Sequence, residues 1–157
     1  MNTPITYVEG DLLVAAKAGK FDAIVHGCNC FCTQKKGIAP LIAKAFGSDK
    51  FPLETKQYKG DRTKLGKIDY QTVTLPSQQP LTIINAYTQY DYRGEKPFDP
   101  LAFRHCMQAI NSLFKGAHIG MPLIGAGLAG GDWDEISKII AAELTNCQVT
   151  VVRLQQR

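Results

Sequence analysis

Short apolar runs alternate with helical patterns along the whole chain, and this alternation limits the fold more than any other feature. Six apolar runs have the length and composition of strands, and they cover residues 5–8, 21–26, 68–75, 81–87, 119–124 and 149–154. Between them, apolar side chains recur at helical spacing in residues 12–18, 41–46, 103–114 and 136–144, and more weakly in residues 50–60. Helices interleaved with strands favour an α/β fold, a three-layer α/β/α sandwich with a mixed, mostly parallel central sheet of about six strands.

The chain has the size and composition of a single globular domain. Its 157 residues are 45% hydrophobic and 20% charged, which excludes a disordered chain, and they contain no internal repeat or linker. We therefore expect residues 1–157 to form one domain. No run reads as a membrane span, and the first twenty residues lack the apolar core of a signal peptide. These observations predict a cytoplasmic protein with no membrane partner, and we expect a monomer.

The net charge of +4 is mildly basic. A charge of this size suits a small anionic ligand. It is smaller than the concentrated positive charge of a nucleic-acid-binding surface, so we expect no nucleic-acid partner. The densest basic segment, residues 56–67, has five Lys or Arg side chains and one Asp. We expect this segment to face solvent, with contact to a phosphate backbone as the alternative.

Five cysteines, at positions 28, 30, 32, 106 and 147, are an odd number in a chain without a secretory signal. This predicts reduced thiols. Together with His26, the first three suggest a metal site, but zinc sites use paired ligands at other spacings, and no second pair lies downstream. Alternate residues of a strand also share one face, so this run alone could not easily surround an ion. We therefore expect no metal and no cofactor.

A glycine-rich loop at residues 125–130 matches the pattern G-x-G-x-x-G and lies between a predicted strand and a predicted helix. A dinucleotide-binding fold also needs an acidic residue at the end of the next strand, but residues 152–154 contain none. A nicotinamide-dependent dehydrogenase is therefore excluded. Glycines still allow backbone N–H groups to approach an anion, and Asp132 is placed to cap the following helix. The loop is a candidate phosphate or pyrophosphate site, with a tight turn needed only for packing as the alternative.

A second candidate site is the segment His26-Gly27-Cys28-Asn29-Cys30, which follows a predicted buried strand. Open α/β sheets bind ligands at such strand ends. The Asn29 amide suits a vicinal diol such as a ribose, and capping a turn is an equally good role for it. His26 at a strand end is by default a core histidine.

These segments together resemble a macrodomain, the ADP-ribose-binding fold. The resemblance is carried by residues 7–12, 26–30, 37–39 and 122–128, together with Trp133, and it spans nearly the whole chain. The His-x-Cys-Asn-Cys run is most similar to the branch that contains the ADP-ribose 1″-phosphate phosphatases. Related enzymes of the same branch remove ADP-ribose from acidic side chains.

The resemblance implies where each part of the ligand lies. In the family, the aspartate after the first strand accepts a hydrogen bond from the adenine amino group, which assigns Asp11 to adenine with Leu12 beside it. Asn29 is implied to hold the distal ribose, and the glycine-rich loop to wrap the pyrophosphate and that ribose. The remaining implied ligand-binding residues are Lys35, Lys36, Gly37, Ile38, Leu123, Ile124, Gly125, Ala126, Gly127, Leu128, Ala129 and Leu154.

The sequence departs from the family pattern in the first loop and at the catalytic positions of the related hydrolases. Lys35 and Lys36 replace small residues, so they either contact phosphate directly or crowd the loop. Ala129 stands where the hydrolases of acidic side chains have a catalytic aspartate, and their catalytic lysine has no match near Ala86.

Three functions follow from the resemblance. The first is a phosphatase that converts ADP-ribose 1″-phosphate to ADP-ribose, with His26 as nucleophile or general acid and Asn29 as the second catalytic residue. The second is an ADP-ribosyl hydrolase that acts on modified targets, and the third is an ADP-ribose reader without catalysis. We expect the first.

Overall fold

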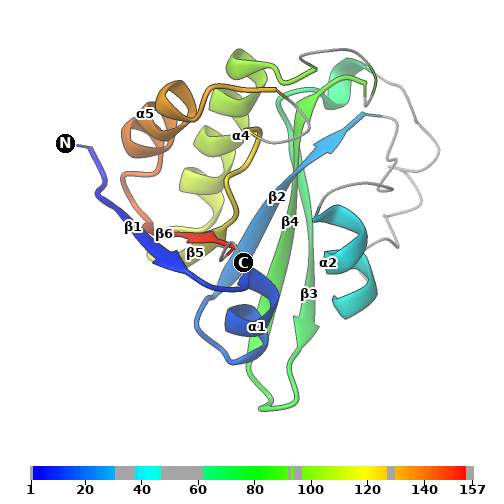
Figure 1. Cartoon of the computed structure of the whole chain (residues 1–157), viewed down its shortest axis with the longest axis vertical. Helices are drawn as coiled ribbons and strands as arrows, with labels where there is room; N and C mark the ends of the chain where they lie inside the picture. Colours follow the sequence, from blue (N-terminus) through cyan, green and yellow to red (C-terminus); the bar gives the residue numbers. More distant parts are fainter. Residues whose placement is uncertain are drawn as a thin grey trace.

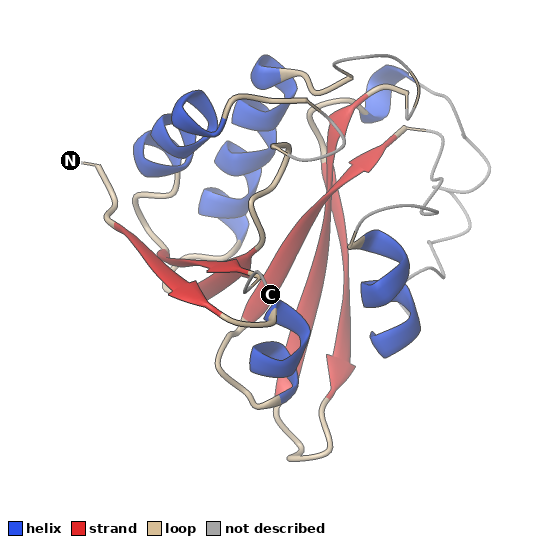
Figure 2. Cartoon of the chain, viewed as in Figure 1, coloured by secondary structure: helices blue, strands red, loops and turns tan. Residues whose placement is uncertain are grey.

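The computed structural model describes residues 2–30, 38–46, 62–91, 93, 97–126 and 130–154. A six-stranded sheet runs through its centre (Figures 1 and 2). In spatial order the strands are β1 (Ile5–Glu9), β6 (Gln148–Arg153), β5 (His118–Met121), β2 (Ala23–Asn29), β4 (Pro80–Gln89) and β3 (Ile68–Thr74). All neighbouring strands are parallel except β3, which pairs antiparallel with β4. The predicted mixed, mostly parallel sheet is confirmed.

Helices cover both faces of the sheet. On one face, α1 (Leu12–Lys17) and α2 (Ala39–Phe46) contribute Leu12, Ala16 and Ile42 to a buried cluster with the sheet residues Ile24 and Ile83. On the other face, α4 (Pro100–Leu113) and α5 (Trp133–Glu143) form the larger cluster with side chains of β2, β4, β5 and β6. A short 3₁₀ helix, η1 (Arg62–Lys64), precedes β3. The three-layer α/β/α arrangement is therefore confirmed.

Three helices begin after an aspartate whose carboxylate accepts a hydrogen bond from a backbone N–H of the first turn. These residues are Asp11 for α1, Asp99 for α4 and Asp132 for α5. Such a side chain satisfies a backbone donor that has no partner inside the helix. The predicted helix cap at Asp132 is confirmed. Because α5 begins directly after this residue, the glycine-rich loop ends before it.

Two strands, β2 and β5, end three residues away from their predicted ends. β2 continues through Gly27 and Cys28 to Asn29, because these residues stay in parallel register with Ala86, Tyr87 and Gln89 of β4. The strand predicted to end at residue 26 therefore continues for three more residues. β5 ends at Met121 instead of residue 124, because Pro122 has no N–H group to continue the ladder. The weak helix predicted at residues 50–60 lies outside the described residues.

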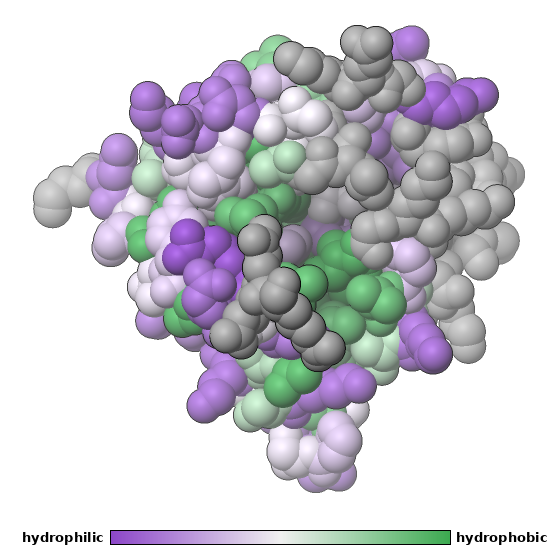
Figure 3. Space-filling view, viewed as in Figure 1, coloured by the Kyte–Doolittle hydropathy of each residue, from purple (hydrophilic) through white to green (hydrophobic). Residues whose placement is uncertain are grey.

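Part of the outer surface of α2 is apolar, beside the exposed Lys44. Figure 3 shows hydrophobic surface over this helix, where Leu41 is exposed while its neighbour Ile42 is buried. Among the described residues, no helix is both long enough and apolar enough to cross a membrane.

Candidate functional site

The carboxyl ends of β1, β6, β5 and β2 are neighbours at one edge of the sheet. The backbone N–H of Gly10 donates to the Arg153 carbonyl (2.8 Å), which joins the end of β1 to the end of β6. The loop after β5 lies against β2, because a Cβ built on Gly27 would be 3.6 Å from Ile124 Cγ1. This edge is where open parallel sheets bind ligands.

Asp11 lies at the end of β1 with an exposed side chain. Its Oδ1 accepts hydrogen bonds from the backbone N–H groups of Leu13 (2.8 Å) and Val14 (3.4 Å). Within the described part of the chain, these bonds reach only Oδ1, so Oδ2 is available to a ligand. Leu12 next to it is buried in the core on the α1 side, so its side chain is a core residue and only its backbone borders the edge.

Asn29 ends β2 and is 5% exposed. It is paired with Gln89 of β4, and the register of the two strands shifts between Cys28 and Asn29. Strand β2 ends at this irregularity. The asparagine therefore lies where the sequence placed it, at the edge that also carries Asp11 and the loop after β5.

The loop after β5 is held by short backbone contacts. Gly125 has φ +78°, and a Cβ on it would lie 2.5 Å from Phe98 Cε2. Its carbonyl accepts from the N–H of Gly131 (2.7 Å), which holds Gly125 close to the residues just before α5. Ile124 is buried and Leu123 is 39% exposed. Gly125 is thus required for packing, one of the two roles that the sequence left open for this loop.

The end of β6 is flanked by exposed aromatic and charged side chains. The Arg153 guanidinium lies 5.1 Å from the centre of the Tyr7 ring and pairs with Glu9 (3.1 Å). Trp133 Nε1 donates to the Tyr7 hydroxyl (3.1 Å). Leu154, which the resemblance assigns to the adenosine, is 75% exposed beside them.

His26 lies within β2, three residues before the strand ends, and is completely buried. Its Nε2 is 2.7 Å from Asn85 Oδ1, and the Asn85 amide donates to Asp69 Oδ1 (2.8 Å). Because the amide nitrogen of Asn85 faces a carboxylate, its oxygen faces the histidine, and Nε2 must carry the hydrogen. By strand alternation the ring is on the same face as Ile24, the face covered by α1 and α2.

Burial lowers the pKa of His26 to about 4, against the smaller opposing effects of the Asn85 hydrogen bond and the Asp69 charge. The imidazole is therefore neutral at neutral pH. Its Nδ1 is buried and has no hydrogen-bond partner among the described residues. This is the environment of a histidine that joins two strands, and the catalytic role of His26 stays a prediction.

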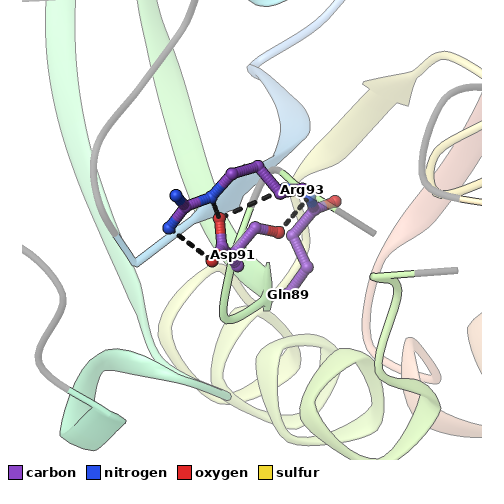
Figure 4. Close-up of polar contacts among 3 residues, drawn as sticks. All are labelled: Gln89, Asp91 and Arg93. Carbon is purple, nitrogen blue, oxygen red and sulfur yellow. Dashed lines mark hydrogen bonds and ion pairs between the residues drawn. The ribbon is translucent and has the colours of Figure 1, made fainter. Parts of the chain in front are cut away.

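Sequence reasoning missed the polar residues that follow β4. Gln89 Nε2 donates to the Asp91 carbonyl (2.8 Å), and the Asp91 carboxylate binds the Arg93 guanidinium (Figure 4). The N–H of Cys30 donates to the Tyr90 carbonyl (2.9 Å), so this segment lies beside the end of β2. In the sequence, this segment has the composition of a polar loop. The one feature that could have pointed to the ion pair is an acidic and a basic residue two positions apart after a predicted strand.

Several predicted ligand-binding residues lie outside the described residues: Lys35, Lys36, Gly37, Gly127, Leu128 and Ala129. Ile38 precedes α2, and it is half-buried against the core on that side of the sheet.

Comparison with known proteins identifies the family. Residues 25–140 match the family model described as "Macro domain". The chain is 31% identical to a 17.5 kDa protein of the tk-vs intergenic region of Enterobacteria phage T4, over 94% of this chain and 95% of that one. It is 28% identical to the ADP-ribose glycohydrolase OARD1 of Bos taurus, over 96% and 91% of the two chains.

A solved structure of Thermosipho africanus DarTG in complex with ADP-ribose is similar to the whole chain, with a TM-score of 0.75 and 14% identity, and the match covers 44% of DarTG. This likeness shows the fold. Together with the family model, which spans most of the sequence, it leads to one conclusion: this chain belongs to the macro domain family.

Proposed function

We propose that this protein binds ADP-ribose at the carboxyl edge of its sheet and hydrolyses a derivative of it. The observation that carries the proposal is that Asp11, Asn29 and the loop after β5 all lie at the carboxyl edge of the four parallel strands β1, β6, β5 and β2. Two findings support it: the family to which the chain belongs, and its similarity to an ADP-ribose glycohydrolase along nearly its whole length.

Each group at the edge has a chemical role in this proposal. Asp11 Oδ2 accepts a hydrogen bond from the adenine amino group, while Oδ1 continues to cap α1. The Asn29 amide binds the hydroxyls of the distal ribose, because it offers both donors and an acceptor. Backbone N–H groups of the glycine-rich loop bind the pyrophosphate, and the mildly basic chain favours an anionic ligand.

The reaction that we propose is removal of the phosphate from ADP-ribose 1″-phosphate. Water breaks the phosphate ester, and the products are inorganic phosphate and ADP-ribose. His26 is neutral and its Nε2–H is already given to Asn85, so the reaction depends on positioning by Asn29 and the two loops. Release of ADP-ribose from modified targets is the second candidate, and the similarity to a glycohydrolase favours it.

One experiment separates these reactions. The protein is incubated with ADP-ribose 1″-phosphate and, in parallel, with an ADP-ribosylated protein, and released phosphate and released ADP-ribose are measured. Phosphate release identifies the phosphatase, and ADP-ribose release identifies the hydrolase. Binding of ADP-ribose in calorimetry without either product identifies a reader. Absence of binding refutes the proposal as a whole.

A further inference from the structure

Thr88, near the end of β4, has a hydroxyl group that none of the described residues binds. Its side chain is 1% exposed, and Oγ1 has no hydrogen-bond partner within the described part of the chain. A buried hydroxyl without a partner destabilises a fold, whereas a valine has the same shape and no such cost. The carbonyl of Thr88 does have a partner, since it accepts from the N–H of Asp99 (2.8 Å). Packing therefore explains the size of this side chain but not its hydroxyl.

The pairing of β2 with β4 passes over Thr88. Cys28 is paired with Tyr87, and the next residue, Asn29, is paired with Gln89, so Thr88 is the extra residue of a β-bulge. Bulges change the direction in which a side chain points, and they are common beside active sites. This bulge lies opposite the last two residues of β2, at the carboxyl edge that carries the proposed ligand site.

The Thr88 hydroxyl faces Gly27 and the loop after β5. A Cβ built on Gly27 would lie 2.9 Å from Thr88 Oγ1 and 3.6 Å from Ile124 Cγ1. Gly27 follows Val25 by two positions on β2, and Val25 belongs to the core under α4 and α5. The hydroxyl, the missing side chain of Gly27 and the loop thus meet on this side of the sheet. Because Gly27 is half-buried, the molecular surface reaches β2 at this point.

The proposed ribose-binding residue lies on the same face. Successive side chains of a strand alternate between its two faces, so Asn29 shares the face of Gly27 and lies about 7 Å further along β2. One sugar ring can therefore contact both the Asn29 amide and the Thr88 hydroxyl. A sugar hydroxyl matches Thr88 chemically, because each group can donate one hydrogen bond and accept two. Burial of Thr88 strengthens such a bond, since the surroundings have a low dielectric constant.

We infer that Thr88 is a further ligand-binding residue, whose hydroxyl binds a hydroxyl of the distal ribose. This rests on the proposed function, because it takes Asn29 as the residue that holds that ribose. The sugar is then held from the ends of two neighbouring strands, and Gly27 leaves the room between them. A ligand that ends at the diphosphate does not reach this hydroxyl, so Thr88 favours ADP-ribose over ADP.

Thr88→Val tests the inference, because it removes the hydroxyl and keeps the shape of the side chain. We expect the dissociation constant of ADP-ribose in calorimetry to rise about fivefold or more, since the bound sugar loses a hydrogen bond. The dissociation constant of ADP should change less than about twofold, because ADP has no distal ribose to lose that bond. The melting temperature without ligand should stay the same or rise, which a structural role of the hydroxyl would not allow. Thr88→Ser keeps the hydroxyl, so it should bind ADP-ribose within about threefold of wild type.

Thr150→Val is the matched control. Thr150 is also a buried threonine of the sheet, but its Oγ1 lies 2.8 Å from Nε2 of His118, the first residue of β5. This variant should lower the melting temperature and leave binding of both ligands unchanged.

Three results for Thr88→Val would overturn the inference. Equal losses of affinity for ADP-ribose and ADP would show that the hydroxyl does not act at the distal ribose. Unchanged affinity for both ligands would show that no part of the ligand contacts it. A fall in turnover at unchanged affinity would assign the hydroxyl to a water molecule instead of the sugar. A wild-type protein that does not bind ADP-ribose would refute the proposed function itself.

Discussion

At the scale of single residues, His26 gives the protein a measurable dependence on pH. Its pKa is about 4 in the folded chain and about 6.5 in an unfolded one, so the unfolded chain binds more protons between these values. The stabilisation is fully present above about pH 6.5 and is lost as the pH falls toward 4, by up to about 1.4 kcal/mol per pH unit. Denaturant melts at pH 4–7 should show this slope in wild type and not in His26→Gln. His105→Gln, an exposed histidine on α4, is the control that should keep it.

A substitution of His26 also distinguishes a catalytic role of this histidine from a structural one. His26→Ala removes the partner of Asn85, so we expect the melting temperature, ADP-ribose binding and turnover to fall together. A catalytic histidine would instead lose about 10²-fold in turnover at unchanged binding and unchanged stability. Activity assays, calorimetry and thermal melts on one preparation distinguish the two results.

Asp11 combines two roles that a substitution can separate. Asp11→Ala removes both the cap of α1 and the proposed adenine contact, and loss of the cap should lower the free energy of unfolding by about 1 kcal/mol. Asp11→Ser restores a capping oxygen but no carboxylate, so stability should recover while ADP-ribose affinity stays low. Calorimetry with inosine and adenosine forms of the ligand should show selectivity for adenine in wild type alone. Recovery of affinity in Asp11→Ser would show that Asp11 acts only through the helix.

At the scale of elements, the loop between β5 and α5 depends on Gly125. Gly125→Ala adds a methyl group 2.5 Å from the Phe98 ring at a positive φ, so the loop must shift. Gly116→Ala is a matched control, because Gly116 has nearly the same φ (+79°) and nothing within 4 Å of the added atom. The control should cost roughly 1–2 kcal/mol and leave ADP-ribose binding intact. Gly125→Ala should cost more and weaken binding, and equal effects in the two variants would show that the contact with Phe98 is unimportant.

Local signals in the sequence predicted most elements but not their contacts. The helix cap at Asp132 depends on neighbouring residues only, so it could be read from the sequence. The bond between Asn85 and Asp69 depends on the register of β3 against β4, which no local pattern specifies. The end of β2 differs from the prediction for a related reason, since Gly27 and Asn29 are poor strand formers that pairing with β4 holds in the sheet. At the site, Asn29 and Gly125 stood out as motif residues, whereas the ion pair of Arg93 with Asp91 lies in a segment without a motif.

At the scale of the whole molecule, one sheet is shared by two cores. Ile83 and Ile84 are adjacent on β4 and fully buried on opposite faces, one under α1 and α2 and the other under α4 and α5. Ile83→Val and Ile84→Val should each lower the free energy of unfolding by about 0.5–1.5 kcal/mol. Because both cores rest on the same strands, the two variants should unfold in one transition with the same dependence on denaturant. A second transition in either urea melt would show that the two faces unfold separately.

The position of β6 between β1 and β5 has a consequence for how the protein is made. In the described sheet β1 pairs with β6 alone, so β1 has no neighbour until residues 148–153 have left the ribosome. Until then the nascent chain exposes the apolar edge of β5 and the unpaired backbone of β1, both of which can pair with other chains. A ribosome that stalls before the codon for residue 148 therefore leaves a chain that cannot close its sheet, however well the preceding helices and strands have formed.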